Sequence, residues 1–299
     1  MQLLLFTGAS GFLGANILPI LKREYAEVFT LGRLSGNDLI VNLAKEVPIL
    51  PHRFDIILHA AGKAHMVPHT IEEEQAFYDV NYQGTVNLCH ALEKVGVPKS
   101  FIFISTVAVY GCEEGELITE DHSTNGITPY ARSKILAEQY LTDWCRNNSV
   151  ILTILRPSLL AGVNAPGNLG AMVDGIKKGF YLNINGGKAR KSIFMAQDIA
   201  NLLPLVKDIG GVFNVCDTYQ PTFGEIAISI SKQLGVREPK SIPYWLAWCA
   251  SQIGNFFGSR APINSCKLRK ITHSLTFSND KIRQTLNWEP MDVLTNYKI

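Results

Sequence analysis

The chain has 299 residues, of which 46% are hydrophobic and 18% charged, and its formal net charge is only +2. This length is enough for one large domain or two unequal ones, and the lack of any long Lys or Arg run argues against nucleic acid as a partner. The six cysteines follow no C-x-x-C pattern and the histidines no ligand spacing, so we expect no metal site and reduced thiols in the cytoplasm. Residues 1–21 carry no charge, but glycines and polar residues interrupt the run, so we expect neither a signal peptide nor a transmembrane span.

The first predicted element is a strand over residues 2–6, followed by the Gly-rich turn T-G-A-S-G-F-L-G and an apolar pattern at helical spacing. Strand, turn and helix in this order are typical of a dinucleotide-binding motif. Gly8 would allow the tight turn, Gly11 would let a pyrophosphate approach the backbone, and Gly14 would let the helix lie close to the strand. The residues of this turn that we expect to bind a cofactor are Gly8, Ser10, Gly11, Phe12, Leu13 and Gly14.

A second predicted strand, residues 28–31, ends at Gly32 and Arg33, where a dinucleotide-binding fold usually carries an acidic residue for the ribose hydroxyls. That acid is absent, and Arg33 is suited to the 2′-phosphate of NADP through paired, charge-assisted hydrogen bonds. A solvated loop arginine is the alternative. The pattern therefore favours NADP over NAD as the cofactor.

Residues 55–59 predict a buried strand that runs into Ala60, Ala61 and Gly62. The small side chains of these three residues would let another edge of the cofactor lie against the backbone. His65 follows in a loop that would overhang the site, and it is either a substrate contact or a solvent-facing loop histidine.

After a helix predicted from Thr70 to about residue 96, the apolar, β-branched run 101–104 ends in Ser105 and Thr106. This pattern predicts a central parallel strand with two hydroxyl groups at its carboxyl end. Ligands of open α/β sheets bind at that end.

The stretch T-P-Y-A-R-S-K predicts the start of a helix, with Thr128 as its N-cap and Pro129 as its first residue. Tyr130 and Lys134 then share one helix face. A phenol has a pKa of about 10, and a nearby ammonium group favours the phenolate, so Tyr130 would exchange protons near neutrality. An exposed tyrosine beside a solvated lysine is the alternative for this pair taken alone.

Further strands are predicted at residues 151–155 and 212–215, and the sequence beyond Asp217 is mainly helical. We therefore expect an α/β fold, a Rossmann-type doubly wound parallel sheet with a smaller, mainly helical C-terminal substrate domain. The predicted NAD(P)-binding domain comprises residues 1–165 and 194–218, and the substrate domain residues 166–193 and 219–299. The apolar stretch 244–257 is too short to span a bilayer and is either a packed helix or a contact with a membrane surface or a second subunit.

The chain resembles the extended short-chain dehydrogenase/reductases, the NAD-dependent epimerase/dehydratase family, in an ordered set of motifs along almost its whole length. The motifs are T-G-A-S-G-F-L-G, H-A-A-G-K-A-H, V-N-Y-Q-G-T, I-S-T-V-A-V-Y-G, T-P-Y-A-R-S-K and L-R-P. The resemblance identifies Thr106, Tyr130 and Lys134 as a catalytic triad. By the same resemblance, Tyr130 would move the proton of a sugar hydroxyl, Thr106 would hydrogen-bond the same oxygen, and Lys134 would hold the nicotinamide ribose and lower the pKa of the tyrosine.

The resemblance also implies a nucleoside-diphosphate sugar as substrate. Asn168 and Leu169 of P-G-N-L correspond to a diphosphate-contacting segment, and Lys191, with Arg190 beside it, replaces an arginine of the family. Pro157 of L-R-P is expected beside the cofactor.

A departure from one of the family's sub-groups narrows the chemistry that the resemblance implies. Val107 and Ala108 stand where 4,6-dehydratases carry an Asp-Glu pair, so proton transfer at C5 and C6 of the sugar has no acid or base. What remains is a 4-epimerase or a 4-keto-sugar reductase acting on a UDP-hexose for surface polysaccharides. A dinucleotide-binding scaffold or sensor without catalysis is the alternative, and a homodimer is left open.

Overall fold

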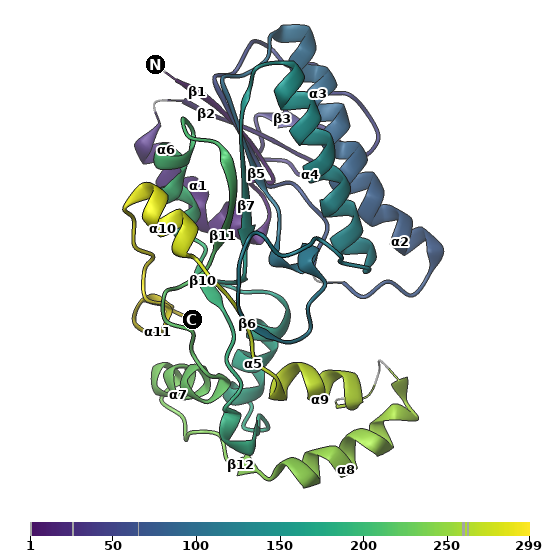
Figure 1. Cartoon of the computed structure of the whole chain (residues 1–299), viewed down its shortest axis with the longest axis vertical. Coiled ribbons are helices and arrows are strands. Elements are labelled where there is room, and N and C mark those ends of the chain that lie inside the picture. The colour runs from purple at the N-terminus through teal and green to yellow at the C-terminus, as the bar shows by residue number, and fades with distance from the viewer. Residues whose placement is uncertain (1, 26, 65, 259–260, 262) are drawn as a thin grey trace.

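The structure, a computed structural model, describes residues 2–25, 27–64, 66–258, 261 and 263–299. A seven-stranded parallel sheet lies at its centre (Figure 1). In spatial order its strands are β11 (Gly211–Val215), β7 (Ile151–Pro157), β5 (Ser100–Ile104), β4 (Ile56–His59), β1 (Leu3–Thr7), β2 (Glu27–Gly32) and β3 (Leu39–Ile40). The chain runs outward from β1 to β3 and then returns to the other side of β1, so the strand order reverses between β1 and β4. Open α/β sheets bind ligands at such a switch point.

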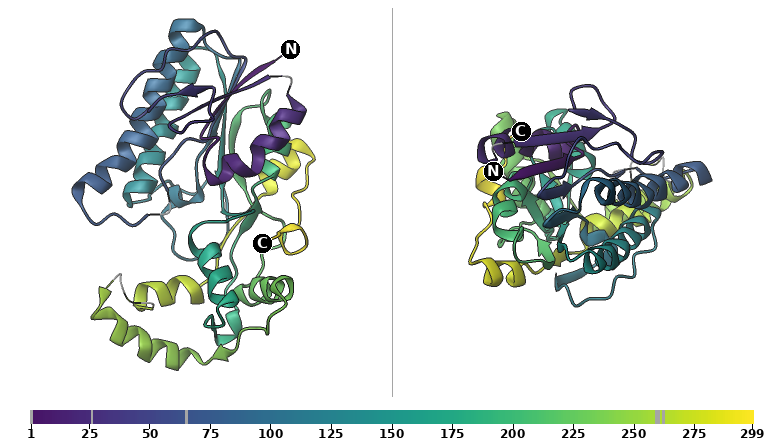
Figure 2. Two further views of the ribbon diagram at one scale, coloured as in Figure 1. Left: turned by 180° about the vertical axis from the view of Figure 1, so that it is seen from behind. Right: turned by 90° about the horizontal axis from the view of Figure 1, so that it is seen from above.

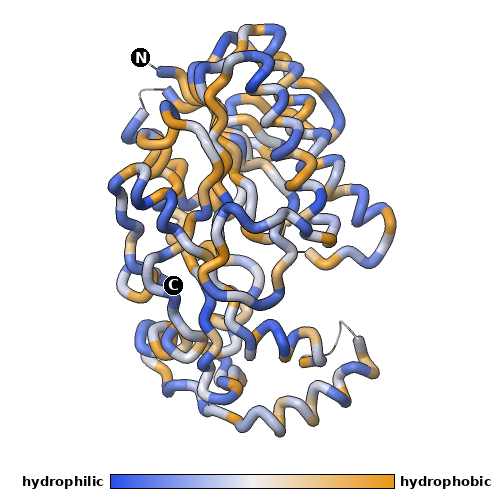
Figure 3. Tube along the Cα trace, in the orientation of Figure 1, coloured by the Kyte–Doolittle hydropathy of each residue, from blue (hydrophilic) through white to orange (hydrophobic). Residues whose placement is uncertain are grey.

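Helices cover both faces of the sheet because successive strand residues point to opposite sides. Phe101 and Phe103 of β5 pack with α3 (Gly84–Val95) and α4 (Pro129–Asn147), whereas Ile102 and Ile104 face the opposite layer. That layer consists of α1 (Phe12–Glu24), α6 (Asp198–Val206) and α10 (Asp280–Leu286). Figure 2 shows the two layers on either side of the sheet, and Figure 3 shows the apolar strands between them. The predicted α/β fold with a doubly wound parallel sheet is confirmed.

The helix predicted from Thr70 is interrupted. Thr70 caps α2 (Ile71–Tyr78) by accepting a hydrogen bond from the backbone of Glu73. A π-helical segment over Asp79–Gln83 then leads into α3. π-Helical segments are rare and occur mostly at functional sites.

The C-terminal region forms the lower end of the molecule in Figure 1 and has apolar clusters of its own. Its elements are α5 (Gly167–Lys177), β9 (Asn183–Ile184), α7 (Phe223–Leu234), β12 (Ser241–Ile242), α8 (Tyr244–Asn255) and α9 (Ser265–Thr272). Short pieces connect this region to the sheet: β6 (Gly115–Ile118), β8 (Leu159–Ala161), β10 (Ile193–Met195), β13 (Leu275–Phe277) and α11 (Val293–Asn296). Within the described part of the chain, no helix is long and apolar enough to cross a membrane.

Candidate active site

The Gly-rich turn between β1 and α1 lies against the end of β4. Gly8 has a φ of +83°, and a Cβ there would lie 2.6 Å from the backbone nitrogen of Ala61. At Gly14 a Cβ would lie 2.3 Å from the carbonyl oxygen of Ala9. Both positions therefore require glycine, the first for the left-handed turn and the second for the close approach of α1 to the turn.

The N-terminus of α1 ends this turn with unpaired backbone donors. Gly11 is the N-cap and no side chain caps the first helical turn, which leaves N–H groups at the positive end of the helix dipole. The Ser10 hydroxyl accepts a hydrogen bond of 2.9 Å from Asn37. Phe12 and Leu13 pack against the apolar clusters, so these two can offer a ligand only their backbone N–H groups.

A pocket of about 200 Å³ opens beside this turn at the carboxyl ends of β1, β2 and β4. Its lining residues are Gly8, Ser10, Gly11, Leu31, Gly32, Arg33, Leu34, Val41, Asn42, Leu43, Ala44, Ala60, Ala61, Gly62 and Val80. The glycine turn and the uncapped helix end fit the pyrophosphate of a dinucleotide. Asn42 and Leu43 were not foreseen, because the two-residue strand β3 that positions them is too short to produce an alternating pattern.

Arg33 is an exposed charge at one edge of this pocket. A Cβ at Gly32 would lie 2.9 Å from the side-chain nitrogen of Asn37, so the amide of Asn37 occupies the space beside the position of the usual ribose-binding acid. The next acid along the chain, Asp38, accepts hydrogen bonds from the backbone and hydroxyl of Thr30, and these contacts hold the pKa of its carboxyl below the ordinary value. Asp38 is thus held by β2.

A fully buried histidine supports the end of β4. The Thr7 hydroxyl lies 2.6 Å from Nδ1 of His59 and accepts from the backbone N–H of Ala61, and Thr85 lies 2.9 Å from Nε2. Because Thr85 donates its own hydrogen to the carbonyl of Asn81, this network assigns a neutral ring with the proton on Nε2. Burial, together with the charge of Lys134, lowers the pKa of His59 to about 3.

The predicted catalytic residues come together from β5 and α4. Thr106 is buried directly beyond β5, and its side chain accepts from the backbone N–H of Ala108. Tyr130 lies in the first turn of α4, where Thr128 accepts from the backbone of Ala131 as predicted for the N-cap. The Thr106 hydroxyl lies close enough to Tyr130 to lower the pKa of the phenol, against the larger effect of burial.

The prediction that Lys134 lowers the pKa of Tyr130 is wrong for this structure. The Lys134 ammonium donates to the carbonyl oxygen of Ile104 at 2.8 Å and lies 4.6 Å from the centre of the Phe103 ring. Burial raises the pKa of Tyr130, with the Thr106 hydrogen bond opposing it, so the phenol is protonated at neutral pH. Burial also lowers the pKa of Lys134 to about 8.

Asn81 in the π-helical segment is part of this site, although no role was predicted for it. Its amide donates to the carbonyl of Lys63 at 3.1 Å and to the Ser133 hydroxyl at 2.9 Å, and its oxygen accepts from the Lys63 N–H at 2.7 Å. A Cβ at Gly62 would lie 3.1 Å from the Asn81 side chain and 3.4 Å from the Lys134 ammonium. Asn81 therefore joins the loop after β4 to the catalytic helix, and this loop connects the catalytic residues to the dinucleotide pocket.

A buried ion pair lies beneath the catalytic residues and was also not foreseen. Arg156 at the end of β7 donates two hydrogen bonds to Glu138 of α4, at 2.6 and 3.1 Å, and Ser105 donates a third. Arg156 also donates to the Tyr110 hydroxyl at 3.0 Å, and Tyr110 to Asn214 at 2.6 Å. Burial disfavours the charge of Arg156, but its contacts with Glu138 outweigh this and raise its pKa. The strand end that carries Thr106 is thereby tied to α4.

The remaining predicted residues occupy different environments. Pro157 is buried at the end of β7, next to Ser158, whose buried hydroxyl has no hydrogen-bond partner within the described residues. Asn168 is exposed in the first turn of α5, whereas Leu169 is buried among apolar side chains. Because the Leu169 side chain is used in packing, only its backbone is available to a substrate, and the predicted contact at this residue stays a prediction. His65 lies outside the described residues.

Arg190 and Lys191 lie on a short segment before β10 and point to different neighbours. The Arg190 guanidinium donates to the carbonyl of Gln220 and lies 5.7 Å from the centre of the Tyr219 ring. Burial, and then the charge of Lys270 on α9, lower the pKa of Lys191 to about 8. A half-buried ammonium beside a second cation is a place where an anion is stabilised. Among the described residues, no cluster of three or more His, Cys, Asp or Glu side chains could hold a metal ion.

Known proteins resemble this chain in sequence and in fold. The chain is 26% identical over 315 residues, covering 94% of this chain and 88% of the relative, to the N-acetyl-alpha-D-glucosaminyl-diphospho-ditrans,octacis-undecaprenol 4-epimerase of Escherichia coli O157:H7. It is 26% identical to the UDP-glucose 4-epimerase of Vibrio cholerae, covering 97% of this chain and 92% of the relative. The UDP-glucose 4-epimerase of Thermotoga maritima, solved with UDP-glucose, shares the fold with a TM-score of 0.77 at 20% identity, covering 99% and 96% of the two chains.

The matching family is described as the NAD dependent epimerase/dehydratase family, and the match covers residues 4–216. This span includes the Gly-rich turn, the dinucleotide pocket, Thr106, Tyr130 and Lys134. The chain therefore belongs to the NAD dependent epimerase/dehydratase family.

Proposed function

We propose that this protein transfers hydride at C4 of a UDP-hexose, as a 4-epimerase or a 4-keto-sugar reductase, in the synthesis of surface polysaccharides in the cytoplasm. The observation that carries the proposal is that Thr106 and Tyr130 come together from β5 and α4, with Lys134 one helical turn away and next to the dinucleotide pocket. A bound nicotinamide dinucleotide supplies or accepts the hydride. The intact triad disfavours the alternative of a scaffold or sensor without catalysis.

The side chains then have separate roles in moving the proton. Tyr130 donates its proton to the C4 oxygen when the ketone is reduced, and the phenolate that remains takes the proton of the C4 hydroxyl when the ketone forms, while Thr106 holds the same oxygen by a hydrogen bond. The raised pKa of Tyr130 keeps the phenol in its donor form, which ketone reduction requires, whereas oxidation of the sugar starts from the phenolate. Lys134, charged below its pKa of about 8, binds the ribose of the cofactor. Val107 and Ala108 supply no acid or base, which disfavours dehydration.

Two features bear on the ligands. Arg33 at the pocket edge, with glycine in place of the usual acid at position 32, favours NADP over NAD. For the sugar nucleotide, Lys191 beside Lys270 supports a diphosphate at this end of the site, with Asn168 and Arg190 as further contacts.

A sugar carried on a polyprenyl diphosphate is a second candidate substrate. The Escherichia coli relative is named for such a substrate, and its diphosphate is chemically the same anchor as that of a nucleotide sugar. The specific observation in its favour is the set of large apolar side chains exposed on α8, in the same region as Lys270.

Three assays, on UDP-hexoses, on a UDP-4-keto-hexose and on an undecaprenyl-diphosphate sugar, distinguish these reactions. The purified protein is incubated with UDP-N-acetylglucosamine and UDP-galactose without added cofactor, and C4-inverted product identifies an epimerase. Stoichiometric consumption of NADPH with a UDP-4-keto-hexose, without inversion in the first assay, identifies a reductase. Inversion only of the undecaprenyl-diphosphate sugar supports the second substrate. Bound dinucleotide with none of these activities would contradict the proposal and favour the scaffold.

A further inference from the structure

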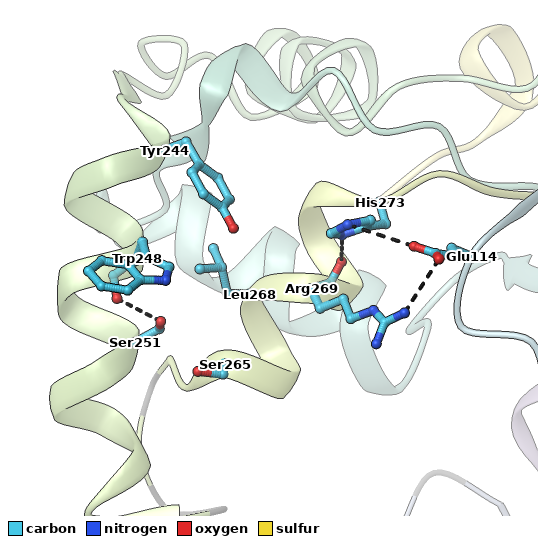
Figure 4. Close-up of a pocket in the computed structure, with 8 residues that line it drawn as sticks. All are labelled: Glu114, Tyr244, Trp248, Ser251, Ser265, Leu268, Arg269 and His273. Atoms are coloured by element: carbon cyan, nitrogen blue, oxygen red, sulfur yellow. Dashed lines mark hydrogen bonds and ion pairs between the residues drawn. The ribbon is translucent and has the colours of Figure 1, made fainter.

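Helix α8 has the reverse of the usual amphipathic pattern. Its buried residues are the small ones, Ala247, Ser251 and Gly254, which face the segment before α9 and α9 itself. A Cβ at Gly254 would lie 1.8 Å from the carbonyl oxygen of Ile263, so the backbones touch there. The Ser251 hydroxyl donates to the carbonyl of Trp248 at 2.7 Å (Figure 4). Small residues on the inner face therefore leave the large ones for the outer face.

The outer face of α8 and the turn after it is apolar and aromatic. Trp245 is 62% exposed, Ile253 65% and Phe256 90%. Leu246 and Phe257 are also exposed, and Tyr244 and Trp248 are exposed on the side of α8 that faces a pocket toward α9. The helix carries no charged residue, and large exposed apolar side chains gathered in this way mark an interaction site. It lies at the lower edge of the molecule, remote from the sheet (Figures 1 and 2).

The same segment is strongly basic. Residues 235–273 contain one acid, Glu238, and six Lys or Arg residues: Arg237, Lys240, Arg260, Lys267, Arg269 and Lys270. The whole chain has a net charge of only +2, so positive charge is concentrated in this stretch of the sequence, where Arg269 is paired with Glu113 and Glu114 of the neighbouring loop. Tyr, Trp and Phe next to Lys and Arg are the side chains enriched where proteins meet the interface of a membrane with anionic lipids.

A pocket of about 310 Å³ opens between α8 and α9, with Tyr244, Trp248 and Leu268 on its walls (Figure 4). At its rim Arg269 lies 3.4 Å from Glu114, and His273 lies 3.7 Å from the same carboxylate. These contacts fix α9 against the loop before β6. The hollow therefore combines the rings of Tyr244 and Trp248 with polar and charged side chains of α9 and of the loop before β6.

We propose that residues 237–273, the α8–α9 hairpin, dock on the surface of an anionic phospholipid bilayer. The aromatic face enters the interfacial region, and the flanking cations meet the headgroups. A second copy of the chain is disfavoured as the occupant, because a two-fold dimer through this patch would set the basic segment against itself. Docking would bring Lys270, and with it Lys191, close to the bilayer. The docking surface stands apart from the proposed reaction and needs no particular sugar.

The test is co-sedimentation of the full-length protein with vesicles of phosphatidylcholine alone or mixed with phosphatidylglycerol. We expect binding to the mixed vesicles that weakens as salt is added. Replacing two aromatic side chains by serine, W245S/F256S, should lower the partition coefficient roughly 100-fold, since each buried aromatic contributes about a factor of ten. Lys240→Glu should lower the same partition coefficient roughly fivefold or more, because it removes a charge that attracts the anionic headgroups.

Matched controls lie far from the hairpin. Ile49→Ser removes an apolar side chain that is 89% exposed, and Lys94→Glu reverses an exposed charge on α3; neither should change vesicle binding. Thermal unfolding and activity on soluble substrate should match the wild type for W245S/F256S, which separates loss of docking from loss of fold or function. Brominated lipids should quench tryptophan fluorescence in the wild type but not in W245S/W248F.

Three outcomes would overturn the proposal. The first is an absence of vesicle binding under every lipid composition. The second is binding that W245S/F256S leaves unchanged. The third is a wild-type dimer that W245S/F256S converts to a monomer, which would identify α8 as a subunit contact.

Discussion

The carboxyl edge of the sheet and the α8–α9 hairpin bury opposite kinds of side chain. At the sheet edge His59, Asn81 and Glu138 are buried, and each is hydrogen-bonded to another part of the chain. In the hairpin the buried residues are small and the large aromatic ones are exposed. The buried polar groups of the sheet edge form their hydrogen bonds within the chain, which offsets the free-energy cost of burying them. The large apolar groups of the hairpin are exposed and available to a binding partner. Changes at the sheet edge should therefore impair catalysis or folding, and changes on the outer face of α8 should impair neither.

The largest effect is expected at Tyr130. Tyr130→Phe removes the hydroxyl that moves the proton and should lower kcat roughly 100- to 10,000-fold. Dinucleotide affinity, measured by fluorescence titration, should stay near that of the wild type because the ring remains. Lys134→Ala serves as the comparison, since it should weaken both turnover and cofactor binding. Near-normal turnover in Tyr130→Phe would rule out its acid/base role.

The buried ion pair should give the next largest effect, on stability. Arg156→Met leaves Glu138 buried without its cation, and we expect it to lower the free energy of unfolding by about 3–5 kcal/mol. Urea unfolding measures this loss. The double variant E138Q/R156M should regain much of the stability, because neither partner then remains charged. If the single variant unfolds like the wild type, the pair does not hold β7 against α4.

The buried histidine should make the protein sensitive to acid. His59 has a pKa of about 3 in the fold and 6.5 as a free side chain, so between these values the unfolded chain binds the extra proton. The contribution of His59 to the free energy of unfolding is then fully present above pH 6.5. Below that pH it falls by up to about 1.4 kcal/mol for each pH unit of acidification. Urea unfolding across this range should show a smaller slope for His59→Gln than for the wild type. Equal slopes would mean that His59 is not buried in its neutral form.

Arg33 should have a smaller effect, confined to the choice of cofactor. Arg33→Ala should weaken the binding of NADPH roughly tenfold and leave the binding of NADH almost unchanged, because only the contact with the 2′-phosphate is lost. Parallel titrations of both dinucleotides measure the ratio. A ratio that stays the same would make Arg33 a solvated loop residue.

The smallest effect is expected on the outer face of α8. Trp245→Ser should change the free energy of unfolding by no more than about 0.5 kcal/mol, although it removes a large apolar side chain. Replacing a buried aromatic residue of the sheet such as Phe101 by alanine should cost about 3–5 kcal/mol. A large loss of stability in Trp245→Ser would show that the exposed face packs within the chain.

The parts predicted from the sequence are those that a local pattern specifies. The strands before Gly8 and Thr106 and the helix capped by Thr128 were predicted close to their observed positions, because apolar runs and caps act over a few residues. The ion pair of Glu138 and Arg156 joins residues far apart in sequence, and no local pattern marks it.

Two other features could be determined only from the folded structure. The direction of the pKa shift of Tyr130 could not be predicted, because the spacing to Lys134 gives no information on burial or on the carbonyl of Ile104 that takes the ammonium. The stretch 244–257 was correctly expected to be a helix. Which of its faces is buried depends on the small residues that fit against Ile263.

Hydride transfer at C4 is the central claim, and isotope labelling tests it directly. The protein is mixed with a UDP-4-keto-hexose and with NADPH or NADH that carries deuterium at the transferable position of the nicotinamide, and the sugar product is analysed by mass spectrometry after a single turnover. We predict that the deuterium is found at C4 of the sugar formed by the wild type, because a 4-epimerase and a 4-keto-sugar reductase share this reduction, and that Tyr130→Phe forms almost none. Loss of the deuterium to water, or reduced sugar formed without the label, would contradict the account.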